Sequence, residues 1–292
     1  MMPIKESELI LNPNGSVYHL NLKPEHVAQT IITVGDPDRV ENVTTHFDTV
    51  EFKIQKREFH TQTGTYKGKR ISVISTGIGT DNIDIVLNEL DALVNINLEK
   101  RQINDKLKSL NIIRIGTSGS IQENVPIDSY LISNMAIGFD SLLHYYDNEH
   151  IQNFDVSKDL EAHLASSAGK SKPYVVSGDK YLIEHFKDSK TYLGITGTNV
   201  GFYGPQGRVL RLKLQDQHLN QKLSSFNHRG NRITNLEMET AGIYGLSKLL
   251  GHKAISMNAI IANRVTGQFS RNPKAVVDAL ILDTLNKIVN LN

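Results

Sequence analysis

The chain has 292 residues, of which 39% are hydrophobic and 22% charged, and its formal net charge is +1. This composition is ordinary for a globular protein with a large core, and the near-neutral charge argues against nonspecific binding to nucleic acid or to an acidic membrane surface. The absence of cysteine excludes disulfides, thiolate metal sites and cysteine nucleophiles. The N-terminus carries acids and no long apolar run, and no stretch approaches the roughly 20 apolar residues that span a bilayer, so we expect a cytoplasmic protein of enzyme size.

Short apolar runs alternate with helical patterns along the chain. The runs that predict strands lie at 30–34, 71–74, 112–115, 130–132 and 254–261. Apolar residues three and four positions apart predict a helix over 83–94 and another over 277–288, which Pro273 would begin.

This alternation indicates an α/β fold with a central mixed, largely parallel twisted sheet flanked by helices. We interpret residues 1–292 as a single domain, with 1–16 as a peripheral N-terminal segment and the polar stretch 145–172 as a surface excursion. In such folds ligands bind at the carboxyl ends of the strands, so the residues that follow each strand are the candidate site.

The first such segment, residues 34–39, reads Val-Gly-Asp-Pro-Asp-Arg. Gly35 would bring the backbone close to a ligand, and Arg39 would add a cation. The alternative is an Asp-Pro turn into a helix that an acid caps.

The next segment, residues 75–82, reads Ser-Thr-Gly-Ile-Gly-Thr-Asp-Asn. It has glycines at 77 and 79, but Asn82 stands where a dinucleotide-binding fingerprint needs a third glycine. The segment therefore predicts a strand-to-helix turn beside a substrate and not a nicotinamide site.

Arg114 interrupts an isoleucine-rich strand and is followed by Gly116, Thr117, Ser118 and Gly119. A charge in a buried strand is costly unless it meets an opposite charge. We expect the glycines to free a turn whose amides and hydroxyls converge with Arg114 on an anion, phosphate above all. The alternative is an arginine paired with a structural carboxylate.

Residues 201–208 read Gly-Phe-Tyr-Gly-Pro-Gln-Gly-Arg. Phe202 would pack against a flat ring, and Gln206 offers a donor and an acceptor, which suits an imide such as uracil. Arg208 would stabilise negative charge that develops on that ring. The alternative is a solvated loop with one packed aromatic side chain.

Two carboxylates flank a methionine in residues 235–242, Asn-Leu-Glu-Met-Glu-Thr-Ala-Gly. Glu239 either accepts hydrogen bonds from sugar hydroxyls or serves as an acid in the first turn of a helix. The 11 histidines are scattered without a His-Glu-x-x-His pattern, so no metal site is expected from them.

The order of these motifs closely resembles the uridine phosphorylases of the nucleoside phosphorylase family. The motifs are Gly-Asp-Pro-Asp-Arg, Arg57-Glu58-Phe59, Ser-Thr-Gly-Ile-Gly, Arg-Ile-Gly-Thr-Ser-Gly, Phe-Tyr-x-x-Gln-x-Arg and Glu-Met-Glu. The resemblance runs from about Val17 to the C-terminal helix, and its specific part is the pair Gln206 and Arg208.

The resemblance implies reversible phosphorolysis of uridine to uracil and ribose 1-phosphate in pyrimidine salvage, with inorganic phosphate as co-substrate and no cofactor. It implies that phosphate is held by Gly35, Arg39, Arg57, Arg114 and Thr117. It assigns the ribose to His19, Glu237, Met238 and Glu239, and the base to Phe202, Gln206, Arg208 and Arg264. Among these, Arg114, Gln206, Arg208 and Glu239 would be the catalytic residues.

The resemblance also implies a homo-oligomer, because Arg57 and His19 would act across a subunit boundary; a dimer is the minimum active unit and a hexamer is compatible. A monovalent cation, such as potassium, would lie near Glu58, Ile78 and Asn82, but Asn82 replaces the serine that the family uses there. The base loop also reads Gly-Pro where the family order is Pro-Gly.

Other functions remain open. A purine nucleoside phosphorylase or a related nucleosidase is the nearest alternative, although Asn263 and Arg264 stand where purine-specific relatives place a serine and an aspartate. A nucleoside-binding module without catalysis is the alternative of a different class.

Overall fold

The computed structural model describes residues 2–164 and 171–291. Its strands are β1 (Thr30–Val34), β2 (Thr49–Lys56), β3 (Phe59–Tyr66), β4 (Lys69–Ser75), β5 (Ile96–Asn97), β6 (Gln102–Ile103), β7 (Asn111–Ser120), β8 (Tyr130–Gly138), β9 (Tyr174–Ser177), β10 (Thr191–Thr198), β11 (Asn227–His228), β12 (Asn231–Glu237), β13 (Lys253–Asn263) and β14 (Gln268–Phe269). Its α-helices are α1 (Pro37–Thr44), α2 (Thr80–Asn95), α3 (Phe154–Leu164), α4 (Lys180–Phe186), α5 (Leu219–Ser225), α6 (Thr240–Leu249) and α7 (Pro273–Val289). Short 3-10 turns are η1 (Pro24–His26), η2 (Leu142–Tyr145), η3 (Glu149–Ile151) and η4 (Gly204–Gln206).

The central sheet contains two parallel runs of strands. One run is β4-β1-β7-β13 and the other is β8-β10-β12. The runs join antiparallel at two places, where β13 pairs with β8 and where β12 pairs with β7. The strands β7, β13, β8, β10 and β12 therefore form a closed ring, and β1, β4, β3 and β2 extend from it as an open sheet.

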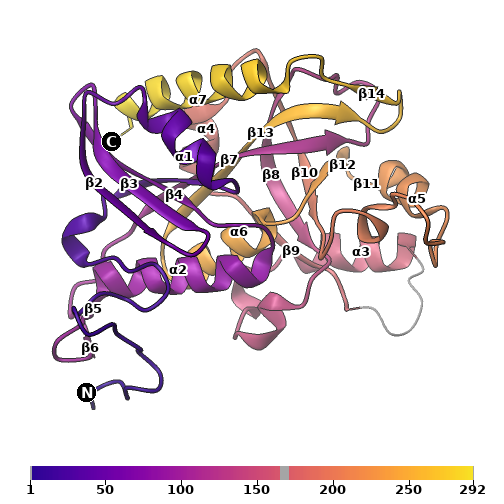
Figure 1. Cartoon of the computed structure of the whole chain (residues 1–292). Helices are drawn as coiled ribbons and strands as arrows, with labels where there is room; N and C mark the ends of the chain where they lie inside the picture. The colour runs from indigo at the N-terminus through magenta and orange to yellow at the C-terminus, as the bar shows by residue number, and fades with distance from the viewer. Residues whose placement is uncertain (1, 165–170, 292) are drawn as a thin grey trace.

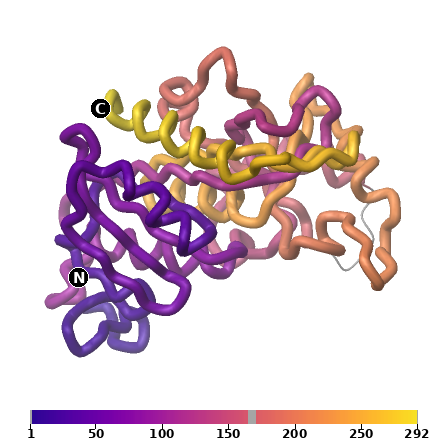
Figure 2. The backbone as a smooth tube through the Cα atoms, turned by 45° about the horizontal axis from the view of Figure 1, so that its top comes forward, coloured from indigo at the N-terminus to yellow at the C-terminus, as the bar shows by residue number. Residues whose placement is uncertain are grey.

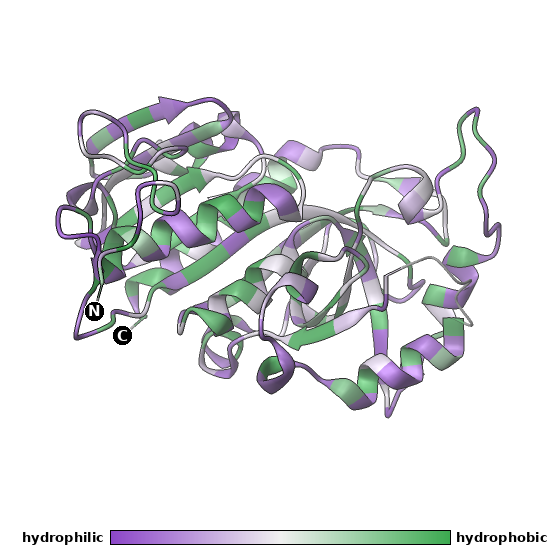
Figure 3. Ribbon diagram, turned by 90° about the horizontal axis from the view of Figure 1, so that it is seen from below, coloured by the Kyte–Doolittle hydropathy of each residue, from purple (hydrophilic) through white to green (hydrophobic). Residues whose placement is uncertain are grey.

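Helices cover both faces of this sheet (Figure 1). Ile31 and Ile112 point to the face that α2 and α6 cover, whereas their neighbours Ile32 and Ile113 point to the face of α1, α4 and α7. Figure 2 shows α7, in yellow, lying over one face of the sheet, and Figure 3 shows apolar residues along the strands and on the helix sides that pack against them. Burial on both faces explains why these strands read as continuous apolar runs. The α/β fold with a mixed, largely parallel sheet is confirmed.

The predicted elements lie where the apolar periodicity indicates. Every predicted strand lies within an observed one, and the two predicted helices lie within α2 and α7. The prediction of a turn at residues 116–119 is wrong, because β7 continues through Ser120 and pairs with β13 along its length. The hairpin of β2 and β3 was not predicted: β2 carries single apolar residues that alternate with polar ones, and polar residues fill the interior of β3.

Two segments that were interpreted as peripheral make contacts with the body of the molecule. Within the N-terminal segment, Leu9 and Ser16 are buried, and Asn12 accepts a hydrogen bond from Lys56 of β2 (3.0 Å). The polar stretch contains α3, which buries Val156 and Leu160, while residues 165–170 of that stretch lie outside the described residues. None of the described helices has the length and apolarity that a bilayer crossing requires.

Candidate active site

The carboxyl ends of β1 and β4 lie side by side and begin the site. The amide of Thr76 donates to the carbonyl of Val34 (2.8 Å), and Gly35 stands so close to Gly77 that an added Cβ would be 3.5 Å from its carbonyl oxygen. Gly77 and Gly79 have φ of +69° and +98°, a region that favours glycine. The predicted strand-to-helix turn is confirmed, because α2 begins at Thr80 directly after these glycines.

Arg114 lies almost fully buried, with 7% of its surface exposed. Its Nη2 is 2.7 Å from Glu239 Oε2 and 3.1 Å from Glu237 Oε2. Burial lowers the pKa of Arg114, but the two carboxylates outweigh this effect and raise the pKa above its ordinary value. The alternative of an arginine paired with buried carboxylates therefore describes this structure. We call Arg114, Glu237 and Glu239 the acid–arginine cluster.

Gly116 makes room for the Arg114 side chain. The two residues share one face of β7, and a Cβ at position 116 would lie 1.9 Å from Arg114 Nη1. The glycine is needed here for space and not for backbone freedom. Thr117 is half-buried on the same strand, while Ser118 accepts a hydrogen bond from Asn235 Nδ2 (2.9 Å).

Arg39 brings a second guanidinium close to Arg114. It lies in α1, whose N-terminus Asp36 caps by accepting from the Asp38 amide (3.0 Å), so the predicted acid-capped turn is also present. Burial and the charge of Arg114 both lower the pKa of Arg39. Its Nη1 reaches only the carbonyl of Ile115 (3.4 Å), and within the described part of the chain it has no carboxylate ion pair. An anion bound here would relieve the repulsion between the two cations.

The two carboxylates of the acid–arginine cluster lie at the start of α6 and accept hydrogen bonds from backbone amides. Glu237 accepts from the amides of Glu239 and Thr240 (both 2.9 Å) and from the Thr198 hydroxyl (2.6 Å). Glu239 accepts from the Gly79 amide (2.9 Å), which ties the turn after β4 to this helix. Burial raises the pKa of Glu239, and Glu237 adds to that rise against the opposing effect of Arg114.

Met238 lies half-buried between these two buried acids. It stands in the bend between the end of β12 and the start of α6. Met238 therefore lies in sequence beside both carboxylates of the acid–arginine cluster.

The base loop, which we define as residues 201–208, turns Gln206 into the protein. Gln206 is 1% exposed, and its Oε1 accepts from Arg208 Nη1 at 2.5 Å. Arg208 also donates to the Phe202 carbonyl (2.7 Å) and stacks 3.8 Å from the centre of the Phe202 ring. The solvated-loop alternative is wrong for Gln206, although Phe202 remains 51% exposed.

Arg264 holds the base loop from the end of β13. Its Nη1 donates to the Gln206 carbonyl (2.6 Å), and its stem lies against Gly119 of β7. Burial and the charge of Arg264 lower the pKa of Arg208 to about 10. Gln206 Nε2 in turn reaches the Glu237 carbonyl (3.5 Å), so the base loop and the acid–arginine cluster are neighbours.

Sequence reasoning missed residues that support these groups. The Asn220 amide of α5 satisfies both of its neighbours when its nitrogen donates to the Gln206 carbonyl (3.1 Å) and its oxygen accepts from Arg264 Nη2 (2.9 Å). Thr198 holds Glu237, and Asn258 of β13 accepts from Arg114 Nη1 (3.1 Å). No motif marks these residues, because only the folded sheet brings them to the site.

His19 and Arg57 lie together, apart from the rest of the candidate set. His19 Nδ1 is 2.7 Å from Glu89 Oε1, and the Arg57 guanidinium lies 5.9 Å from the centre of the Tyr18 ring. Arg57 is exposed at the turn between β2 and β3, with φ of +56°. Neither residue forms a hydrogen bond or ion pair with Arg114 or with the base loop within the described chain.

The three residues expected near a monovalent cation surround Gly77 only in part. A Cβ on Gly77 would lie 2.5 Å from Asn82 Nδ2 and 3.2 Å from Glu58 Cγ, so both side chains approach this glycine. Ile78 is 66% exposed. Over residues 2–164 and 171–291, no group of three histidine, aspartate or glutamate side chains is arranged to hold a metal ion.

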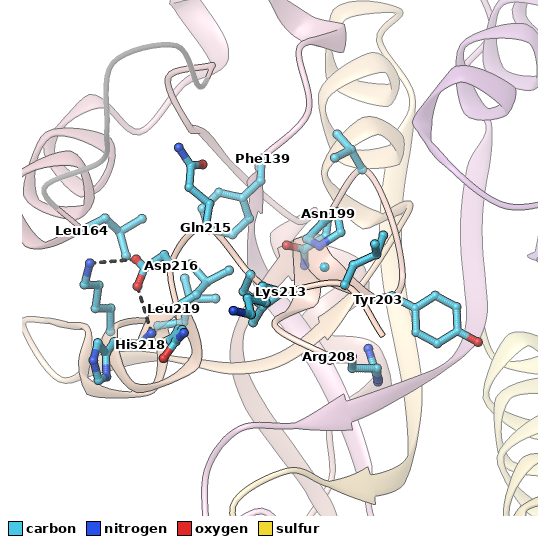
Figure 4. A pocket seen from close by; sticks show the side chains of 18 of the residues that line it. Phe139, Leu164, Asn199, Tyr203, Arg208, Lys213, Gln215, Asp216, His218 and Leu219 are labelled. Carbon is cyan, nitrogen blue, oxygen red and sulfur yellow. Dashed lines mark hydrogen bonds and ion pairs between the residues drawn. The ribbon is translucent and has the colours of Figure 1, made fainter. Parts of the chain in front are cut away.

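A cavity of about 1400 Å³ adjoins the outer side of the base loop. Figure 4 shows Tyr203 and Arg208 at one end of this cavity and Asp216 and His218 at the other. The acid–arginine cluster does not line it. The base loop therefore separates this open space from the buried charges.

Comparison with known proteins gives consistent matches over nearly the whole chain. The family model of the phosphorylase superfamily matches residues 29–286. A uridine phosphorylase of Thermococcus kodakarensis is 31% identical over 88% of this chain and 81% of that protein, and a DeoD-type purine nucleoside phosphorylase of Listeria welshimeri is 27% identical over 86% and 88%. A solved nucleoside phosphorylase of Trypanosoma brucei, described as showing uridine phosphorylase activity, has a TM-score of 0.86 and 29% identity over 97% of this chain and 99% of that one.

Proposed function

The chain belongs to the phosphorylase superfamily, and from this premise we propose that it catalyses the reversible phosphorolysis of uridine to uracil and ribose 1-phosphate. Relatives named uridine phosphorylase, and a structural neighbour described as having that activity, support the proposal. Inorganic phosphate is the co-substrate in this scheme, and no organic cofactor takes part.

The observation that carries the proposal is the position of Gln206. Its amide is buried, its oxygen meets Arg208, and its nitrogen points toward the Glu237 backbone. An amide beside a guanidinium offers the donor and acceptor pattern that the imide edge of uracil requires. A pyrimidine held there would place its sugar toward Glu239 and Met238.

The proposed chemistry separates charge across the glycosidic bond. As the bond breaks, positive charge develops on the ribose and negative charge on the departing uracil. Arg208 and Gln206 would stabilise the uracil anion, and phosphate held by Arg39 and Arg114 would stabilise the cationic sugar and then attack it. Preorganised donors of this kind contribute about 100- to 1000-fold each to the rate. The ribose hydroxyls would donate hydrogen bonds to Glu239, and the acid–arginine cluster would orient the sugar in this way.

A purine substrate is disfavoured by the surroundings of Asn263. Its Nδ2 donates to the carbonyls of Gln122 (2.9 Å) and Val125 (3.0 Å), and its Oδ1 accepts from the amides of Val265 (2.9 Å) and Thr266 (3.1 Å). An amide has two donors and two acceptor sites, so this side chain is fully used. Asn263 therefore has no free donor or acceptor with which to protonate or bind a purine ring.

A homo-oligomer is part of the proposal, with a dimer as the minimum active unit. Arg57 is exposed, and it lies near His19 on the side of Tyr18, where neither residue bonds to the acid–arginine cluster of its own chain. Both would then serve the site of a neighbouring subunit, Arg57 at phosphate and His19 at the ribose. Light scattering of the purified chain would measure the assembly.

The experiment that tests the function is product analysis with uridine in the presence and absence of phosphate. We expect uracil and ribose 1-phosphate in equal amounts, and no uracil when phosphate is omitted. Release of uracil and free ribose without phosphate would instead identify a nucleosidase. Binding of uridine without any cleavage would identify a nucleoside-binding module.

A further inference from the structure

A series of buried polar side chains, joined by hydrogen bonds, runs around the closed ring of strands; we call it the polar chain. It contains one or two residues from each strand of the ring: Arg114 and Ser118 of β7, Asn258 of β13, Ser133 of β8, Thr196 of β10 and Asn235 of β12. None of them exposes more than 7% of its surface. Apolar side chains would fill such a space at lower cost, so a continuous polar chain there calls for a specific reason.

Four of the five hydrogen bonds that join these side chains have an assigned donor, and those four donate in the same direction around the ring. Arg114 Nη1 donates to Asn258 Oδ1 (3.1 Å), and Asn258 Nδ2 donates to Ser133 Oγ (3.2 Å). The hydroxyls of Ser133 and Thr196 bond to each other, and Thr196 Oγ1 donates to Asn235 Oδ1 (2.9 Å). The Asn235 amide donates in turn to a hydroxyl back on β7 (2.9 Å).

The direction follows from the guanidinium. An arginine only donates, so Asn258 must turn its oxygen toward Arg114 and its nitrogen toward Ser133. Since the Ser133 oxygen accepts from Asn258, the Ser133 hydroxyl must donate its hydrogen bond to Thr196. Each link is therefore defined by the link before it, and the last one returns to the strand that carries the arginine.

Asn258 holds the edge of Arg114 that faces away from the carboxylates. Glu239 takes Nη2, while Asn258 and Ser256 take Nη1 (3.1 and 3.4 Å). Gly116 leaves open the space through which this edge passes. Without Asn258, Nη1 would keep only the long bond to Ser256. The guanidinium would then be free to turn and bind the cluster carboxylates with both nitrogens, which would neutralise its charge more completely.

We propose that Asn258 is a positioning residue, which keeps Arg114 turned so that its charge remains available to bound phosphate. Asn258 itself is fully buried and would not touch substrate. The inference rests on the proposed function, because it assumes that phosphate binds beside Arg39 and Arg114. It adds that phosphate affinity depends on an uncharged acceptor on β13, the strand that pairs with β7 beside Arg114.

Two variants of one residue test the inference. Asn258→Ala removes the nearer of the two acceptors of Arg114 Nη1 and leaves only the longer bond to Ser256, and Asn258→Asp keeps the shape but places a third carboxylate on Arg114. Both should raise the KM for phosphate by about tenfold or more, with a much smaller change in the KM for uridine. The matched control is Asn95→Ala, because Asn95 is also a buried amide (2% exposed) but binds Asp91 and Lys108 at the end of α2.

Calorimetry with inorganic phosphate and no nucleoside separates this inference from the proposed function. We expect the wild-type protein to bind phosphate, the Asn258 variants to bind about tenfold more weakly, and the control to bind as wild type does. This readout holds even if uridine is not the substrate. Equal phosphate affinity in the wild type and the Asn258 variants would overturn the inference, as would a wild type that binds no phosphate.

A third variant covers the case in which the Asn258 variants do not fold. Ser133→Ala removes only the next link, so Asn258 loses its own support while Arg114 keeps its acceptor. We expect a rise of about threefold in the phosphate KM. A Ser133→Ala protein with lower thermal stability and an unchanged phosphate KM would show that the polar chain serves stability alone.

Discussion

The acid–arginine cluster is almost closed to solvent, whereas the base loop beside it is half open. Arg114 has two carboxylates and a neutral acceptor around it. Arg208 meets an amide oxygen, a carbonyl and the face of an exposed ring, with no carboxylate among its described hydrogen bonds or ion pairs. Arg114 is paired with buried carboxylates and tied into the fold, with its Nη1 edge held by Asn258. Arg208 has no such carboxylate within the described chain and, in the proposed function, meets the negative charge that develops on the base. Changes at the two places should therefore have different effects.

The largest effect should come from Arg114→Ala. This change leaves Glu237 and Glu239 buried without their cation, which typically costs about 3–5 kcal/mol of unfolding free energy. We also expect loss of phosphate-dependent turnover. Chemical denaturation measures the first effect and steady-state kinetics the second.

The control for Arg114→Ala is Lys274→Ala. Lys274 is paired with Asp278 at 2.7 Å, but the side chains are 74% and 40% exposed. An exposed pair contributes less than about 1 kcal/mol. Equal losses of stability in the two variants would contradict a special role for the buried cluster.

Arg208→Ala should separate activity from stability. We expect kcat for uridine to fall by about 100- to 1000-fold, because a preorganised donor for the leaving base is lost. The unfolding free energy should change by less than about 1 kcal/mol, since the side chain is half exposed. Arg211→Ala, at an exposed arginine of the same segment, is the control and should leave kcat unchanged; a similar fall there would point to a general effect of charge.

Gly116→Ala should disturb the cluster by its size alone. The added Cβ would lie 1.9 Å from Arg114 Nη1, so the guanidinium must move, at a cost of about 1–3 kcal/mol. Gly119→Ala is the matched control on the same strand, because its Cβ would meet Arg264 Cδ at an ordinary 3.6 Å. Thermal melts of both variants, and their KM for phosphate, would measure the difference. Identical behaviour would show that Gly116 is not needed for the position of Arg114.

The pH dependence should give the smallest effect. The pKa of Arg208 is lowered to about 10 by burial and by the charge of Arg264. In the proposed function the protonated form of Arg208 stabilises the uracil anion, so kcat should fall as the pH rises through this value. In Arg264→Gln the neighbouring charge is gone, the protonated form of Arg208 is favoured, and the fall should move to higher pH. Identical pH profiles of kcat for the wild type and Arg264→Gln would show that the charge of Arg264 does not lower the pKa of Arg208.

The sequence predicted the parts of the fold and the site that local patterns encode. Continuous apolar runs mark strands buried on both faces, and the order of short motifs marks the residues at the strand ends. The function of Gly116 was misread, because the sequence shows a glycine but not the arginine that passes over it. The base loop was predicted without the burial of Gln206, which depends on Arg264 and Asn220 from distant segments.

The closed ring of strands explains most of what the sequence did not show. Asn258 and Ser133 carry no recognisable motif, and they reach Arg114 only because β13 pairs with both β7 and β8. Pairings of this kind join segments more than 100 positions apart in the chain. Local periodicity carries no information about such contacts.

The ratio of kcat/KM for uridine to that for inosine, at saturating phosphate, tests the central claim most directly. A site built around buried hydrogen bonds to a pyrimidine should prefer uridine by at least about 100-fold. Equal rates, or a preference for inosine, would contradict the role of Gln206 and Arg208 as the residues that select the base.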